Sequence, residues 1–229
     1  MEPKLKETLD KIFGNVFGYK NPFTPEQFMQ KFAFDVRLPK QTNDSVTGEV
    51  TWAQSLAPGR FITAENSKKM TDKFELPLRS LKTIEEILNA WQETNMMATE
   101  RHKESLNVFE SDNIYNSDTV FRCLDIHRSK NIAYCDSVLD SEFVAASQRS
   151  SSLTYCIRVE DSKECSKSFN VIWSGKITNS MFIQDCYDMF ECMFCSHMTG
   201  KKYCIANMQF EEAEYFELKK LVIDWLLKS

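Results

Sequence analysis

The chain of 229 residues lacks any apolar run that approaches the roughly 18 residues of a membrane-spanning helix. It also lacks a basic block, because 28 Lys and Arg stand against 33 Asp and Glu and the net charge is −5. The N-terminus, MEPKLKETLDKIF, has no signal-peptide pattern. We therefore expect neither nucleic acid nor a membrane as partner, and a cytoplasmic, reducing compartment.

Glycine is scarce, and no glycine-rich loop precedes Lys176, so Gly175-Lys176 is not a phosphate-binding P-loop. Cysteine is absent before Cys123, although eight Cys follow from there. Seven of the eight, all but Cys204, fall on the repeat described next. A free Cys behaves as a small apolar residue, so we predict reduced, buried, structural thiols.

A small residue recurs at every sixth position between Ser111 and Cys192, with one three-residue shift at Ser147-Gln148-Arg149-Ser150. Of the 20 Ser and Cys residues in this segment, 15 lie on this frame. A mostly apolar residue lies halfway between them, which makes the unit (Ser/Cys)-x-x-(aliphatic)-x-x. A period of six fits neither an α-helix nor a flat strand and is typical of a solenoid.

The repeat predicts a mainly β protein built on a hexad-repeat β-solenoid. Three hexads would make an 18-residue coil, as in hexapeptide β-helices, and the repeat would then give about five coils. The three-residue shift predicts a bulge at a corner near Gln148-Arg149. The aliphatic frame predicts that Val159 and Ile177 are buried inside the coil.

The rest of the chain predicts a mixed N-terminal region and capping helices at both ends of the solenoid. We divide the chain into an irregular, Phe-rich region (1–79), a helix that covers the open first coil (80–107), the solenoid (108–206) and a C-terminal helix (207–229). The last helix would cap the final coil or pack along its side. Within the first region we expect helices near Lys4–Phe13 and after Thr24-Pro25-Glu26, and strands around Phe34–Leu38, Glu49–Trp52 and Arg60–Ile62.

The stretch CMFCSHMTGKKYCIANMQFEEAEYFELKK ends the repeat and carries a family resemblance. It resembles the C-terminal signature of uncharacterised Cys/Ser-rich repeat proteins of candidate-phyla-radiation bacteria and large bacteriophages, sometimes labelled as CaiB/BaiF-type CoA transferases. The resemblance covers roughly residues 105–220 and implies a bacteriophage virion or accessory role. Relatives often begin with a paired-Cys zinc module, which this chain does not have. The matching residues are Cys192, Cys195, Lys202, Tyr203, Cys204, Ile205, Asn207 and Tyr215.

The sharpest candidate for a metal site is the set Cys192, Cys195, His197 and Cys204, because zinc takes four such ligands. The repeat already explains Cys192 and Cys195 as interior residues, however. In a CxxC whose two Cys occupy successive interior positions, three residues apart, both sulfur atoms would point into the coil. We therefore predict no bound metal and no cofactor.

Hexapeptide β-helix enzymes use a His as general base in acyl transfer, so the three His residues are the catalytic candidates. His127 and His197 are the main ones, and His102 is the third. The chain lacks the Gly/Ala-rich coils and the long projecting loop that those enzymes show. An acyl or CoA transferase is therefore the alternative function.

The favoured function is a noncatalytic structural or protein-interaction module that presents a rigid face to a protein partner or to its own copies. On an 18-residue coil, Tyr134, Tyr155 and Trp173 would stack on one side, and we predict that they form the interface. The competing expectation is that the Phe-rich first 79 residues cover this side.

Overall fold

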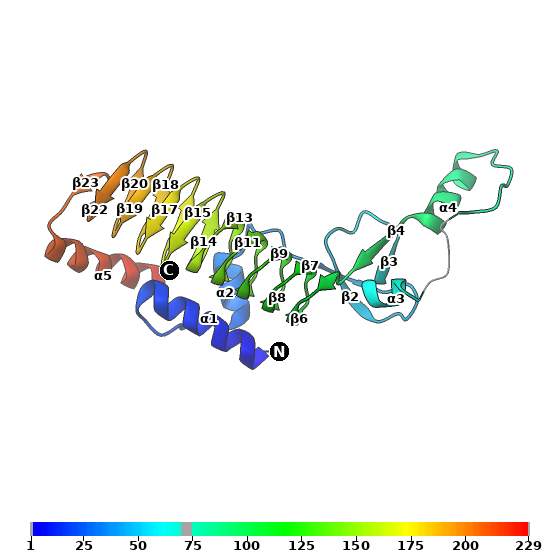
Figure 1. Cartoon of the computed structure of the whole chain (residues 1–229), viewed down its shortest axis with the longest axis horizontal. Helices are drawn as coiled ribbons and strands as arrows, with labels where there is room; N and C mark the ends of the chain where they lie inside the picture. The colour runs from blue at the N-terminus through cyan, green and yellow to red at the C-terminus, as the bar shows by residue number, and fades with distance from the viewer. Residues whose placement is uncertain (1, 70–74, 229) are drawn as a thin grey trace.

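A computed structural model describes residues 2–69 and 75–228, and it shows a long β-solenoid with 12 residues in each coil (Figure 1). Asp112 pairs with Leu124 and Ile114 with Ile126, in parallel register, and the same step of 12 recurs up the stack. The predicted β-solenoid is confirmed, but the coil contains two hexads instead of three. The solenoid has about nine turns, so the predicted count of five coils is wrong. A six-residue period is compatible with any coil whose length is a multiple of six residues.

Almost every hexad forms one short strand. The solenoid strands in chain order are β5 (His102–Lys103), β6 (Leu106–Phe109), β7 (Asp112–Tyr115), β8 (Asp118–Phe121), β9 (Leu124–His127), β10 (Lys130–Ala133), β11 (Asp136–Leu139), β12 (Glu142–Ala145), β13 (Gln148–Ser151), β14 (Thr154–Glu160), β15 (Lys163–Ser166), β16 (Phe169–Ile172), β17 (Gly175–Thr178), β18 (Met181–Gln184), β19 (Tyr187–Phe190), β20 (Met193–Ser196), β21 (Thr199–Lys202), β22 (Cys204–Ile205) and β23 (Met208–Gln209).

The backbone enters the left-handed region at every third residue of the solenoid, which is how so short a coil closes. Asn113, Asn116 and Thr119 have φ values of 66°, 51° and 59°, and the series continues without interruption to His197. These positions are almost all non-glycine, so each costs on the order of 1 kcal/mol of backbone strain. The parallel hydrogen bonds made to the coils above and below offset this cost.

The small residues of the frame complete the hydrogen bonding of the coil. The Ser111 hydroxyl donates to the Phe109 carbonyl at 2.7 Å and accepts from the Cys123 amide of the next coil at 2.9 Å. Ser129 does the same with the His127 carbonyl and the Ser141 amide. A side chain therefore serves as the partner for backbone groups that the turn directs inward.

The three-residue shift produces no bulge, which corrects the prediction at Gln148-Arg149. Gln148 pairs with Glu160 and Ser151 with Lys163, so the step of 12 passes through the shift unbroken. The shift instead changes the residue type in each of the four interior columns. Columns with small residues before the shift contain large apolar residues after it, and columns with large apolar residues before it contain small residues after it. The columns are Ser111-Cys123-Cys135-Ser147-Val159-Val171-Ile183-Cys195, Ile114-Ile126-Val138-Ser150-Ser162-Ser174-Cys186-Met198, Ser117-Ser129-Ser141-Leu153-Cys165-Ile177-Met189 and Val120-Ile132-Val144-Cys156-Ser168-Ser180-Cys192-Cys204. Val159 and Ile177 are fully buried, as predicted.

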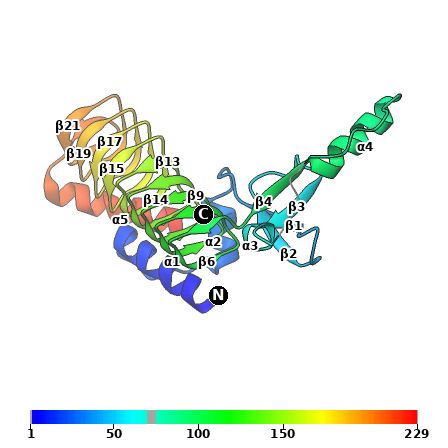
Figure 2. The ribbon, with the colours of Figure 1, turned by 45° about the vertical axis from the view of Figure 1, so that its right-hand side comes forward.

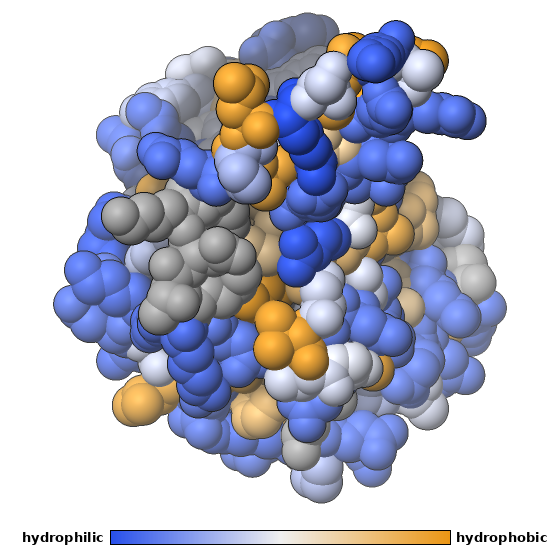
Figure 3. Space-filling model, turned by 90° about the vertical axis from the view of Figure 1, so that its right-hand side faces the viewer, coloured by the Kyte–Doolittle hydropathy of each residue, from blue (hydrophilic) through white to orange (hydrophobic). Residues whose placement is uncertain are grey.

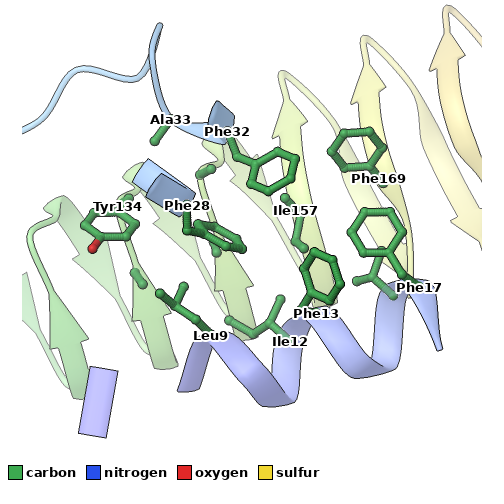
Figure 4. Close-up of a cluster of buried hydrophobic side chains, with 14 of the residues drawn as sticks. Leu9, Ile12, Phe13, Phe17, Phe28, Phe32, Ala33, Tyr134, Ile157 and Phe169 are labelled. Carbon is green, nitrogen blue, oxygen red and sulfur yellow. The ribbon is translucent and has the colours of Figure 1, made fainter. Parts of the chain in front are cut away.

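Three helices pack along one outer side of the solenoid: α1 (Glu2–Phe17), α2 (Pro25–Phe32) and α5 (Glu212–Lys228) (Figures 1 and 4). They bury an outward apolar column with one member per coil. Its members are Phe121, Ala133, Ala145, Ile157, Phe169, Met181 and Met193. On the solenoid, α1 contacts β10, β12 and β14. The predicted helix after Thr24 is confirmed, with a capping box between Thr24 and Gln27.

The part of the N-terminal region that follows α2 forms a small separate unit beside the first coil. It contains β1 (Lys40–Asn43), β2 (Val50–Ala53), β3 (Arg60–Thr63), α3 (Ala64–Ser67) and β4 (Met96–Thr99). β1 pairs with β2 antiparallel, and β3 pairs with β4 parallel. The strand expected at Phe34–Leu38 is absent, since the first strand starts at Lys40.

The helix expected at the start of the solenoid is shorter than predicted and does not cover the first coil. α4 (Ile84–Thr94) begins with a capping box at Thr83 and Glu86, but it projects away from the solenoid (Figures 1 and 2). The first coil instead adjoins the small unit, where Arg101 binds the buried Asp112 through a 2.8 Å ion pair. At the other end, β22 and β23 form a hairpin, and α5 runs back along the side.

Candidate functional site

The three aromatic residues predicted to form one interface lie on different sides of the 12-residue coil. Tyr134 is buried at 3% exposure, and its hydroxyl donates to the Pro25 carbonyl at the start of α2. Tyr155 is half-buried and stacks on Phe143 at 4.7 Å. Trp173 is 61% exposed. The shared surface was inferred from an 18-residue coil and does not exist on this fold, which leaves Trp173 as its exposed member.

The residues proposed as zinc ligands are only partly brought together, since the three Cys lie near one another inside the coil and His197 lies outside it. Cys192, Cys195 and Cys204 are buried inside the coil, whereas the His197 side chain is 73% exposed on the outer surface. The Nδ1 atom of His197 lies 2.7 Å from Asp185 Oδ2. Within residues 2–69 and 75–228, no group of three or more His, Cys, Asp or Glu side chains has a metal-binding arrangement.

All eight Cys residues are unpaired and buried, which the interior frame predicted for the seven on the repeat but not for Cys204. Their thiols hydrogen-bond to carbonyl groups of the coil, as Cys123 does to Phe121 at 3.1 Å. Burial raises the pKa of Cys156, and it raises the pKa of Cys165 to about 12. A thiol with so high a pKa stays protonated and is a poor nucleophile.

The other two His residues have structural partners. His127 stacks on Tyr115 with ring centroids 5.0 Å apart, and its Nε2 atom lies 3.1 Å from Asp125 Oδ1. The Nε2 atom of His102 lies 2.8 Å from the Ser111 carbonyl.

The second half of the solenoid carries a trough of about 670 Å³ on a side that the helices leave open. One wall is the column Arg149, Asp161, Trp173 and Asp185, and the other is Ser151, Lys163, Gly175, Tyr187 and Thr199. The floor is made by the small interior residues Ser162, Ser174 and Cys186. The trough therefore exists because the phase shift brings small residues into this interior column.

α4 presents an apolar stripe that no other described part of the chain covers. None of its residues is buried, and Ile84 and Trp91 are 68% and 58% exposed. Ile87 and Leu88 lie between them and are nearly half exposed. Figure 3 views the molecule from this end and shows apolar surface among hydrophilic side chains. The helix predicted over residues 80–107, which contains this stripe, was expected to cover the first coil.

A second apolar surface lies where α5 meets β20. Phe194, Leu221, Val222 and Trp225 line a shallow, wholly apolar hollow of about 440 Å³. Trp225 is 55% exposed and lies 6.1 Å from the Phe182 ring. No described helix has the length and apolar character needed to cross a membrane.

Comparison of the chain with protein-family models, with curated proteins and with solved structures finds no match.

Proposed function

We propose that this protein is a noncatalytic protein-interaction module in which the β-solenoid is a rigid arm and α4 is the recognition helix. The observation that carries the proposal is the exposed apolar stripe of α4, a helix without a single buried residue among those described. The helices that lie on the solenoid differ from α4, since α1 and α5 bury apolar residues against the coils.

The length of α4 supports a role that is completed by a partner. It has 11 residues, and isolated helices shorter than about 12–15 residues are marginal in water. Its capping box and the ion pair between Arg79 and Glu93, at 2.6 Å, hold the two ends in place. A partner that buries Ile84, Leu88 and Trp91 would supply the packing that this helix does not receive within the chain.

Charge indicates what kind of partner fits. Glu85 and Glu86 lie in the first turn of α4, and the helix has no basic residue in its last turn. A parallel pair of such helices from two copies would bring these carboxylates together, which disfavours self-association. We therefore assign α4 to another protein that has an apolar groove with basic residues at its rim.

The solenoid suits the role of an arm because association then loses little conformational freedom. Each coil is joined to its neighbours by parallel hydrogen bonds, and the interior is tightly filled. A rigid surface reduces the entropy lost on binding. The helix is presented at one end of this arm, clear of the coils (Figure 2).

The acyl or CoA transferase alternative rests on the use of a His as general base by hexapeptide enzymes, whose 18-residue coil differs from the 12-residue coil here. His127 and His197 are engaged by carboxylates on the surface and lie apart from each other. No observation on the described residues favours this alternative over the interaction module.

Photo-crosslinking tests the proposal. A benzophenone amino acid at position Leu88 is photoactivated in the source cells, and the protein crosslinked to it is identified. The affinity of that protein for the full chain is then measured with purified components. We expect Trp91→Ala to weaken the complex about tenfold or more, since aromatic anchors dominate such interfaces. Added salt should weaken it further, because the proposed rim is basic.

Trp225→Ala is the matched control, since Trp225 is similarly exposed on α5. It should leave the affinity unchanged, and both variants should melt like the parent. A complex that Trp91→Ala leaves intact would overturn the proposal, and so would crosslinking of Leu88 only to a second copy of the chain.

A further inference from the structure

The trough on the open side of the solenoid runs along the stack of coils. Trp173 and Gly175 lie at the same coil level on opposite walls, with the floor residue Ser174 between them. Successive levels are separated by about 4.8 Å, the spacing of hydrogen-bonded strands. An occupant of the trough would therefore meet a repeating series of sites along its length.

Two aromatic rings line the trough from opposite walls. Trp173 is 61% exposed and Tyr187 is 42% exposed. Tyr187 belongs to the wall that contains Gly175, one coil further on. A Cβ atom at Gly175 would lie 3.1 Å from two carbons of the Tyr187 ring, so the ring folds back over the glycine backbone. The absence of a side chain at Gly175 thus sets the position of the second ring.

Charged side chains along the walls hold the Trp173 ring in a defined setting. Arg149 binds both oxygens of Asp161 at 2.9 Å and also contacts Glu160. Trp173 follows Asp161 in the same column, one coil further on, and lies beside its carboxylate. The Arg149 hydrogen bonds are the main reason that the pKa of Asp161 lies below its usual range.

The charges that line the trough balance. Arg149 and Lys163 are matched by Asp161 and Asp185, and Asp185 is also engaged by His197. A trough for an anion would carry an excess of basic groups, and a trough for a cation would carry an excess of carboxylates. Exposed aromatic faces between neutralised polar groups fit a ligand that has both apolar C–H faces and hydroxyl groups.

We propose that this trough binds a linear, neutral oligosaccharide, with one sugar ring on Trp173 and further rings along the coil stack. The C–H face of a pyranose ring packs on the indole, and the hydroxyl groups bond to Asp161, Lys163 and Ser151. The site is independent of α4, which lies at the other end of the molecule (Figure 1).

Isothermal titration calorimetry of the full chain tests this site. The probes are the neutral hexamers of β-1,4-glucose, β-1,4-mannose, β-1,4-N-acetylglucosamine and α-1,4-glucose. We expect at least one of them to bind with a Kd tighter than about 1 mM, the range of a single shallow site. Trp173→Ala should weaken this binding about tenfold or more, which corresponds to about 1.4 kcal/mol.

Two further variants separate the site from general stability. Gly175→Ala should also weaken binding, because the new methyl group displaces the Tyr187 ring. Trp91→Ala on α4 is the matched control and should leave binding unchanged. Trp173→Ala and Trp91→Ala should melt within a few degrees of the parent, since both side chains are exposed. Gly175→Ala should do so as well, because the Tyr187 ring that it displaces is partly exposed and can move.

Three outcomes would overturn the proposal. The first is that none of the four hexamers binds at about 10 mM. The second is that a hexamer binds the parent and Trp173→Ala equally well. In the third, the chain prefers a hexamer of lysine or of galacturonate, which would assign the trough to a charged ligand.

Discussion

The Ser and Cys residues of the frame have two functions in this fold. The first is spatial, because their small size suits places where backbones approach closely. The structure adds a second function. The hydroxyl or thiol donates a hydrogen bond to a carbonyl of its own coil and accepts one from a backbone amide of the next coil. Ala would fit the space equally well but offers neither bond. The hydrogen bonding explains why the frame uses Ser and Cys.

Ser129→Ala should therefore destabilise the protein although it leaves almost no cavity. The substitution removes the partners of the His127 carbonyl and the Ser141 amide, and an unsatisfied buried group costs about 1–3 kcal/mol. Ser129→Cys should cost less, because a thiol donates and accepts weakly. Urea denaturation measures both free energies of unfolding.

Ser151→Ala provides the control for this prediction. Ser151 lies on an outward position of β13 and is only half-buried. Its substitution should change the free energy of unfolding by less than about 0.5 kcal/mol. Equal losses in Ser129→Ala and Ser151→Ala would show that the frame acts through something other than these hydrogen bonds.

At the scale of elements, amphipathic helices proved easy to predict and hard to place. α1 and α4 both show an apolar stripe in the sequence. α1 lies on the solenoid because Ala133 and Ala145 leave room for it to approach, and Leu9, Ile12 and Phe13 become fully buried there (Figure 4). α4 meets no such surface. A stripe indicates that a helix needs a partner surface, but the location of that surface depends on contacts distant in sequence.

The small unit before the solenoid depends on one carboxylate, Asp44, which is 1% exposed. Burial alone would raise the pKa of Asp44, but hydrogen bonds from the Thr63 amide, Asn66 and the Val46 amide outweigh it and hold the pKa well below its usual range. A group with a depressed pKa stabilises the fold above its unfolded-state pKa and loses this contribution as the pH falls. The stabilisation should therefore be complete above about pH 5 and decline below about pH 4.

Hydrogen exchange of residues 45–66 checks this prediction between pH 7 and pH 3, after correction for the intrinsic exchange rate. Protection of this segment should fall with the pH earlier than protection of the solenoid. Asp44→Asn should lower protection at pH 7 and abolish the selective loss in acid. A segment that loses protection in step with the solenoid would contradict the assignment to Asp44.

At the scale of the whole molecule, the sequence was sufficient for the fold class but not for the coil. The hexad frame predicted the solenoid and its interior, down to Val159 and Ile177. It could not distinguish two hexads per coil from three, because both keep every frame residue inside. The left-handed positions that close a 12-residue coil are occupied by ordinary residues such as Thr119 and Tyr134, so glycine gave no signal. The trough could not be predicted either, because its walls combine residues 12 apart.

Deletions within the repeat distinguish the two coil lengths directly. Removing residues 114–125 takes out one coil and joins Asn113 to Ile126, so every column continues in place. Removing residues 114–119 joins Asn113 to Val120 and also keeps the hexad frame, but it rotates all later coils by half a turn. The column that α1 buries then moves away from the helix. We expect the 12-residue deletion to keep a cooperative melt with modest loss of stability, and the six-residue deletion to expose apolar surface and aggregate. Circular dichroism and sedimentation measure both results. Loss of folding in the first deletion together with a folded 18-residue deletion (114–131) would contradict the 12-residue coil.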